Sequence, residues 1–210
     1  HMILASQSPR RRDLLAAVGF ELSVAPARID EARHDGEAPV ELVSRLAREK
    51  ARACRSRLGE APADGLLVAA DTVVWTDEAT VLGKPADAAD ARRMLRALSG
   101  RTHHVSTGVS ALLLSPAAEQ LDARSFVETT DVTFWPLEEA VIDAYVATGE
   151  PFDKAGSYAI QGAGRLLVQK VRGDYATVVG LPIARLVREL AGLTGRADLV
   201  AHALERGTHA

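Results

Sequence analysis

The ten residues from Leu66 to Trp75 constrain the fold more than any other segment, because they read Leu-Leu-Val-Ala-Ala-Asp-Thr-Val-Val-Trp. Such a nearly continuous apolar run predicts a strand that is buried on both faces. Asp71 interrupts the run, and an ionised carboxylate in a buried strand costs on the order of several kcal/mol unless it is paired or binds a cation. Either the strand bends outward at Asp71 or this carboxylate lines a site, and we favour the site.

The segments around this strand alternate between helical and strand patterns. Apolar periodicity and cap residues predict helices at 8–18, 40–58, 87–98, 138–148 and 182–190, and strands at 2–6, 20–24, 66–75, 81–82, 104–114 and 125–134. The last two strands are expected to be antiparallel neighbours. We therefore expect an α/β protein whose mixed central sheet is flanked by helices, in two lobes around a cleft. One domain is expected over residues 2–195, followed by a C-terminal tail at 196–210 that is a loose helix or frayed.

Composition excludes several classes of protein. The 210 residues carry a formal net charge of -3, which gives no general attraction for nucleic acid or an anionic membrane, so neither partner is expected. No apolar run approaches the roughly 18 to 20 residues of a membrane span. Cys54 is the single cysteine, so an intrachain disulfide is impossible and a reducing compartment, the cytoplasm, is expected.

Three consecutive arginines, Arg10 to Arg12, stand at the start of the first predicted helix. Cations are unfavourable at this end of a helix by roughly 0.3 to 1 kcal/mol each, because the backbone already carries partial positive charge there. An anion held by the N–H groups, the guanidinium groups and the hydroxyls of Ser6 or Ser8 would reverse that cost, and phosphate is the obvious candidate. The alternative is a solvated surface run, which we favour for Arg12.

Lys50 and Glu31 are two further candidates. Lys50 falls at the helical interval of Val43, Leu46, Ala47 and Cys54, on the stripe that should face the interior. A buried lysine needs a partner, although it can also pack its stem and keep the ammonium group in water. Glu31 could supply a second oxygen ligand for a hard cation beside Asp71; alone it is an ordinary acidic loop residue.

The segment 149–164 contains four glycines together with Lys154 and Gln161, and it is too long for a simple connection, so we expect a ligand-binding loop. No Gly-x4-Gly-Lys-Ser/Thr motif is present, which excludes an ordinary P-loop enzyme. The adjacent His103 and His104 lack zinc-site spacing and are interpreted as structural. The cations Arg10, Arg11, Lys50, Lys84 and Lys154, with Asp71 and Glu31 as possible metal ligands, suit a nucleoside triphosphate that arrives with magnesium.

Ordered motifs along nearly the whole chain carry a family resemblance. They are Ser6-Gln7-Ser8-Pro9-Arg10-Arg11, Asp30-Glu31, Leu46-Ala47-Arg48-Glu49-Lys50-Ala51, Ala70-Asp71-Thr72-Val73-Val74, Gly83-Lys84-Pro85, Leu98-Ser99-Gly100, Thr107-Gly108-Val109, Asp153-Lys154-Ala155-Gly156, Ile160-Gln161-Gly162, Gly173-Asp174-Tyr175 and Val178-Val179-Gly180-Leu181-Pro182. The chain resembles the Maf nucleotide pyrophosphatases, whose fold is similar to that of ITPase-like enzymes.

The resemblance implies metal-dependent cleavage of the α–β phosphoanhydride of a nucleoside triphosphate, with Mg²⁺ or Mn²⁺ as cofactor. Asp71 would accept the proton of the attacking water and bind the metal with Glu31. Four residues would bind the phosphates: Arg10, Arg11, Lys50 and Lys84. A homodimer is plausible.

The resemblance also implies a substrate. The branch acting on dTTP and UTP is similar at Arg10, Thr72 and Gln161, and the Gln161 amide could read a pyrimidine edge. The 7-methyl-GTP branch has glutamine after the catalytic aspartate and lacks the 153–162 loop. A nucleotide-binding regulator of septum formation is the alternative from another class. One departure from the family is Thr177, where asparagine is common.

Overall fold

A computed structural model describes residues 1–61, 65–77 and 80–207, which form one seven-stranded sheet in the order β2-β1-β3-β5-β6-β7, with β4 paired to β3. The strands are β1 (Met2–Leu4), β2 (Leu22–Val24), β3 (Leu66–Trp75), β4 (Val81–Leu82), β5 (Thr102–Leu114), β6 (Gln120–Phe134) and β7 (Val168–Arg172). β1 is parallel to both β2 and β3. The neighbouring pairs β3–β5, β5–β6 and β6–β7 are antiparallel. The expected mixed sheet is therefore confirmed.

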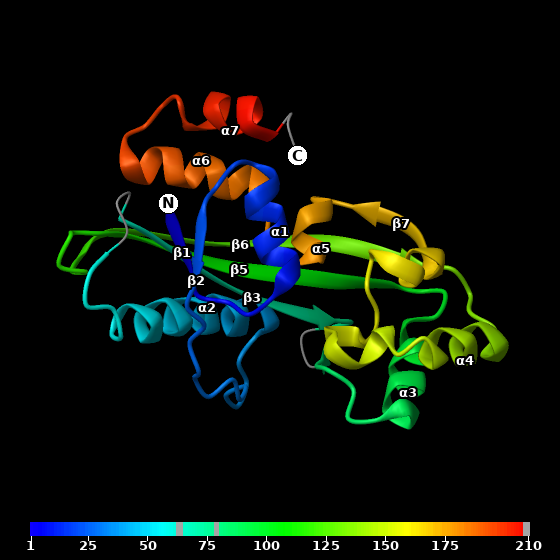
Figure 1. Cartoon of the computed structure of the whole chain (residues 1–210). Coiled ribbons are helices and arrows are strands. Elements are labelled where there is room, and N and C mark those ends of the chain that lie inside the picture. Colours follow the sequence, from blue (N-terminus) through cyan, green and yellow to red (C-terminus); the bar gives the residue numbers. More distant parts are fainter. Residues whose placement is uncertain (62–64, 78–79, 208–210) are drawn as a thin grey trace.

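Helices cover both faces of this sheet (Figure 1). They are α1 (Pro9–Ala17), α2 (Pro39–Arg55), α3 (Ala88–Leu98), α4 (Glu139–Ala147), α5 (Tyr175–Val179), α6 (Ile183–Thr194) and α7 (Leu199–Gly207). α2 lies on one face and α1, α5, α6 and α7 lie on the other, while α3 and α4 gather at the far end of the long β5–β6 ladder (Figure 1). No helix of the described ranges is long and apolar enough to cross a membrane.

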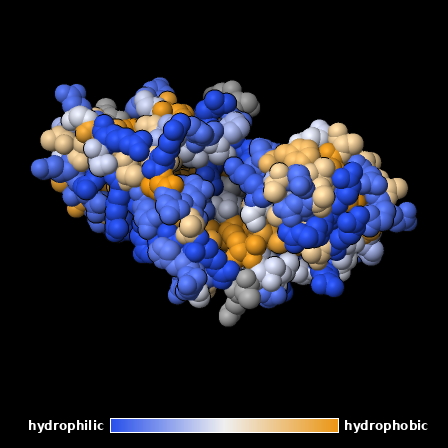
Figure 2. All heavy atoms as spheres, turned by 90° about the horizontal axis from the view of Figure 1, so that it is seen from below, coloured by the Kyte–Doolittle hydropathy of each residue, from blue (hydrophilic) through white to orange (hydrophobic). Residues whose placement is uncertain are grey.

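Two lobes share the central strands. One core joins β1, β3 and β5 to α1, α6 and α7, and a second joins α3 and α4 to the other ends of β3, β5 and β6. Seen from the α2 side, the surface has two masses with a hollow between them (Figure 2). The expected α/β fold with two lobes around a cleft is thus confirmed.

The edge of β3 explains where the cleft lies. β1 pairs with β3 only as far as Val68, and β4 pairs with it only from Val74 onward. Within the described residues, no strand covers the intervening edge, and this stretch contains Asp71 and Thr72. The strand of the sequence prediction is therefore continuous, and a gap in its pairing rather than an outward bend gives Asp71 its access.

Other segments differ from the sequence expectation. β6 begins at Gln120 instead of residue 125, because a long hairpin with β5 pairs even its polar residues. β7 was not expected, since Val-Gln-Lys-Val-Arg is short and polar and is ordered by pairing with β6. The segment 149–164 contains short 3₁₀ helices at Glu150–Asp153 and Ala155–Ser157 and the start of a third at Gly162–Leu167. Residues 199–207 of the expected tail form α7, which buries Leu199 and Ala203 in the core; residues 208–210 lie outside the described part.

Candidate active site

A cavity of about 1,060 Å³ lies between the lobes and brings together every site residue expected from the sequence. These are Ser6, Ser8, Arg10, Arg11, Glu31, Lys50, Asp71, Thr72, Lys84, Lys154 and Gln161. They come from the turn after β1 together with the first turn of α1, the segment after β2, helix α2, strand β3, the turn after β4 and the loop before β7. A collection drawn from six separate segments is a property of the fold and not of any one motif.

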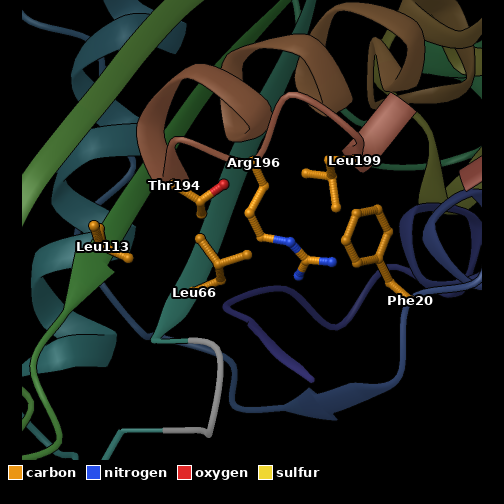
Figure 3. Close-up of a pocket in the computed structure, with 6 residues that line it drawn as sticks. All are labelled: Phe20, Leu66, Leu113, Thr194, Arg196 and Leu199. Carbon is orange, nitrogen blue, oxygen red and sulfur yellow. The ribbon is translucent and has the colours of Figure 1, made fainter. Parts of the chain in front are cut away.

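A smaller cavity of about 210 Å³ lies between the strands and the segment that joins α6 to α7 (Figure 3). Four apolar side chains and Thr194 line it, and the Arg196 side chain extends into it. None of the expected site residues borders this cavity. It belongs to the packing of the C-terminal helix against the sheet.

Lys50 holds two carboxylates together. Its Nζ lies 2.5 Å from Asp71 Oδ1 and 2.7 Å from Glu31 Oε1. The side chains of Lys50 and Asp71 are only 11% and 16% exposed, whereas Glu31 is 61% exposed. The interior lysine therefore has its partner, and Asp71 is fixed at the wall of the cavity with Glu31 at its mouth.

A glycine makes this pairing possible. Gly108 of β5 stands directly opposite Asp71 in the ladder, and a Cβ there would lie 2.3 Å from the carbonyl oxygen of Val43 and 2.9 Å from the nitrogen of Ser44. The absent side chain lets the backbone of α2 cross directly over the ladder. Lys50 lies about two helical turns beyond Val43 on the same face, so it reaches Asp71.

The start of α1 is built around Arg11. Ser8 caps the helix by accepting from the Arg11 N–H at 3.5 Å. The buried Arg11 guanidinium donates to Ser6 Oγ, Thr72 Oγ1 and the Gly180 carbonyl, at 2.8 to 3.1 Å. Burial is the main cause that lowers the pKa of Arg11 from its usual value. Arg11 thus joins three segments of the cavity wall, a role that the sequence did not reveal.

The other arginines of the run lie in different environments. Arg10 faces the cavity and pairs with Asp153 at 3.5 Å, with its side chain 30% exposed. Arg12 is 58% exposed, pairs with its neighbour Asp13 and does not border the cavity, as expected for a solvated residue. Lys154 Nζ donates to the Glu150 carbonyl at 2.9 Å and also pairs with Asp153.

The glycine-rich loop is held against the cavity by specific contacts. The Gly156 N–H donates to the Gly83 carbonyl at 3.0 Å, which brings the Lys84 turn and the Lys154 loop together. Gly156 has φ +70°, and a Cβ there would lie 2.9 Å from Val74, so the close approach requires glycine. Lys84 and Gln161 are exposed residues, and both line the cavity.

An apolar wall completes the lobe that carries Gln161. Sequence reasoning missed its members, which are Val74, Val105, Tyr158, Ile160 and Val179. A flat aromatic or aliphatic surface beside exposed cations can accommodate a base at one end and phosphates at the other. Tyr158, an aromatic residue inside the glycine-rich loop, was an available signal for it.

The departure at Thr177 is accommodated locally. Asp174 caps α5, and its Oδ2 accepts from both the N–H and the hydroxyl of Thr177, at 2.7 and 2.8 Å. The Thr177 carbonyl accepts from Thr107, whose hydroxyl also contacts Thr72 at 2.8 Å. Threonine at this position therefore leaves no group unsatisfied, and Thr72 stays connected to α5.

Buried His103 supports the apolar wall from behind, because its Nε2 lies 2.8 Å from the Tyr158 hydroxyl. Burial, aided by His104, lowers the pKa of His103 to about 4. Below about pH 6.5 the His103 imidazole is protonated in the unfolded chain, whereas in the folded protein it stays neutral down to about pH 4. We therefore expect this residue to make the protein lose stability as the pH falls from 6.5 to 4, by up to about 3 kcal/mol.

The check is urea unfolding of the wild-type protein and His103→Gln at pH 7, 6 and 5. Glutamine retains a partner for Tyr158 but does not titrate, so its free energy of unfolding should fall less steeply on acidification. Parallel pH profiles for the two proteins would contradict the expectation.

Glu31 and Asp71 are the carboxylates of the cavity that a divalent cation could use. Both contact the Lys50 ammonium, and Mg²⁺ typically binds one or two carboxylates together with substrate phosphates and water. In the described part of the chain, no group of three or more His, Cys, Asp or Glu residues could hold a metal ion.

The family model described as "Maf-like protein" matches residues 1–193. This chain belongs to the Maf family. The Maf match includes both lobes and ends in the last turn of α6, before α7 begins.

Several Maf relatives have names that state an activity. A protein of Bacillus cytotoxicus named dTTP/UTP pyrophosphatase is 47% identical over 188 residues, which are 90% of this chain and 93% of the relative. Proteins of Bacillus cereus and Bacillus anthracis with the same name are also 47% identical, over 189 residues with the same coverage. Enzymes of this family are metal-dependent in general.

Proposed function

We propose that this Maf protein is a nucleotide pyrophosphatase that hydrolyses dTTP and UTP to the monophosphate and pyrophosphate. The observation that carries the proposal is the Asp71 carboxylate held by Lys50 inside a cavity whose other walls present Arg10, Arg11, Lys84 and Lys154. The near full-length similarity to relatives with that name supports the same substrates.

In this proposal the cavity divides into two functional ends. The base lies against the Tyr158 wall, where the Gln161 amide can donate to O4 and accept from N3 of a pyrimidine. The triphosphate extends past Asp71 toward the cations of α1 and α2. Since a triphosphate carries about four negative charges, positioning and charge neutralisation are the main tasks of these side chains.

The chemical step follows from the position of Asp71. Its carboxylate accepts a proton from a water molecule, the water oxygen bonds to the α-phosphorus, and the bond from that phosphorus to the bridging oxygen breaks. The leaving group is pyrophosphate. Glu31 and Asp71 would hold a divalent cation, Mg²⁺ or Mn²⁺, which supplies neutralisation of phosphate charge when bound. Lys50 orients Asp71 by direct contact.

The other functions considered have less support. Thr72 follows Asp71 where the 7-methyl-GTP branch has glutamine, and the 153–162 loop lies in the cavity. A nucleotide-binding regulator of septum formation would not need the Asp71–Lys50 pair. The reducing cytoplasm is the proposed compartment, consistent with the free Cys54 thiol.

The test is pyrophosphate release from a panel of dTTP, UTP, dCTP, dATP, dGTP and 7-methyl-GTP, with Mg²⁺, with Mn²⁺ and with EDTA. We expect turnover of dTTP and UTP above the other nucleotides, and its loss in EDTA. No pyrophosphate release from dTTP with either cation would overturn the proposal.

A substitution at Gln161 tests base recognition. Gln161→Glu removes the amide donor and should lower kcat/KM for dTTP and UTP by roughly tenfold or more, because a polar group that loses its partner discriminates strongly. Gln169→Glu, an exposed position on β7 outside the cavity, makes the same chemical change and should have little effect. Equal kcat/KM values in the two variants would show that Gln161 does not recognise the base.

A further inference from the structure

Two cations of the cavity have no role in the account above. Arg28 and Arg57 both border the cavity. Lys50 is paired with Glu31 and Asp71, and Arg10 and Lys154 are paired with Asp153. No acidic partner in the described residues pairs with Arg28 or Arg57. Two guanidinium groups that face a cavity without a counterion are available to an anion.

Both arginines line the part of the cavity near the C-terminal end of α2, which lies past Lys50 along the helix. Arg57 is seven residues after Lys50, and the turn that follows α2 keeps a helical path, with the Arg57 N–H donating to the Cys54 carbonyl at 3.1 Å. This spacing places the Arg57 backbone on the same side of α2 and about 10 Å farther along its axis.

Arg28 belongs to the segment that follows β2. The Cys54 thiol donates to the Ala25 carbonyl at 3.1 Å, which ties this segment to the end of α2 between Lys50 and Arg57. Arg28 and Arg57 are therefore on two chain segments that are joined to each other. Cys54 packs with Leu67 and Ala69 of β3, which precede Asp71, whereas Tyr158 packs in the same cluster as Val74, which follows it. This end of the cavity is therefore across Asp71 from the apolar wall.

Helix stabilisation does not account for Arg57. Arg52 and Arg55 already lie in the last turn of α2, where cations interact favourably with the helix dipole. Neither of them borders the cavity, whereas Arg57 does.

We infer that Arg28 and Arg57 form an anion subsite that binds the terminal phosphates of the substrate and, after cleavage, the pyrophosphate product. The inference rests on the proposed function for the identity of the anion. Guanidinium groups suit this role because their planar donor pairs match two phosphate oxygens at once. Both side chains are exposed, so the interaction is screened by salt and each residue contributes modestly.

The experiment uses Arg28→Gln, Arg57→Gln and the double variant. Arg52→Gln is the matched control, because Arg52 lies in the last turn of α2 but does not border the cavity. Calorimetric titration of the full chain with inorganic pyrophosphate, and separately with dTMP, measures the affinity of the phosphate end and of the base end of the site. We expect each cavity variant to weaken pyrophosphate roughly three- to tenfold, and the double variant more, with dTMP affinity unchanged. The loss should shrink as the salt concentration rises, and Arg52→Gln should match the wild type.

Kinetics supply the second measurement. The same variants should raise KM for dTTP and the inhibition constant of pyrophosphate together, while kcat changes little. Pyrophosphate affinity equal to that of Arg52→Gln, or an equal loss of dTMP and pyrophosphate, would overturn the subsite. Failure of wild-type turnover would instead reject the proposed function, and pyrophosphate binding in calorimetry would still report on the subsite.

Discussion

Asp71→Asn should abolish turnover of dTTP while nucleotide binding is retained. The carboxamide has almost the same volume but cannot accept the proton of the attacking water, and a general base typically contributes about 10²- to 10⁴-fold to the rate. We therefore expect kcat to fall by at least about 10²-fold, with the dissociation constant of dTTP within a few-fold of the wild type. Pyrophosphate release and calorimetric titration measure the two quantities.

The control for this variant is Glu49→Gln, which removes one carboxylate charge from the residue before Lys50. Glu49 pairs with Arg45 and does not border the cavity, so kcat should stay close to wild type. A normal rate of dTTP hydrolysis by Asp71→Asn would show that another group accepts the proton.

Gly108→Ala should lower both the stability and the activity of the protein. The added methyl group would overlap the backbone of α2 at Val43 and Ser44, which cannot rotate away as a side chain could. Either α2 moves off the sheet or β5 distorts, and overpacking of this kind costs typically about 1 to 3 kcal/mol. Any movement of α2 also separates Lys50 from Asp71, so kcat/KM should fall as well.

Chemical unfolding with a parallel activity assay measures both effects. Gly192→Ala is the control, because this α6 glycine has nothing within 4 Å of an added Cβ. Alanine there should stabilise the protein by up to about 1 kcal/mol, since glycine is the poorer helix former. Wild-type stability and activity in Gly108→Ala would show that a methyl group fits between α2 and the β3–β5 ladder.

Much of the site could be recognised from residues that contradict their surroundings. Asp71 interrupts an apolar strand, Lys50 falls on an apolar helix face, and arginines begin a helix. Each of these costs free energy unless another group compensates for it, so each one indicated an interaction that the local sequence does not contain. The pairing of Lys50 with Asp71 could not be read in the same way, because the partners are 21 residues apart and belong to different elements.

The local patterns by themselves determined the order of helices and strands, the mixed α/β class and the residue types available for phosphate and metal chemistry, because periodicity and capping act within a few residues. Only the tertiary structure decided that the pairing of β3 is interrupted at Asp71, that Gly108 admits α2, and that Arg11 joins Ser6, Thr72 and Gly180. Those outcomes depend on contacts between segments that are far apart in the chain. The energy of a charge in such a contact depends on its distance from its partner and on its burial, and local sequence patterns encode neither.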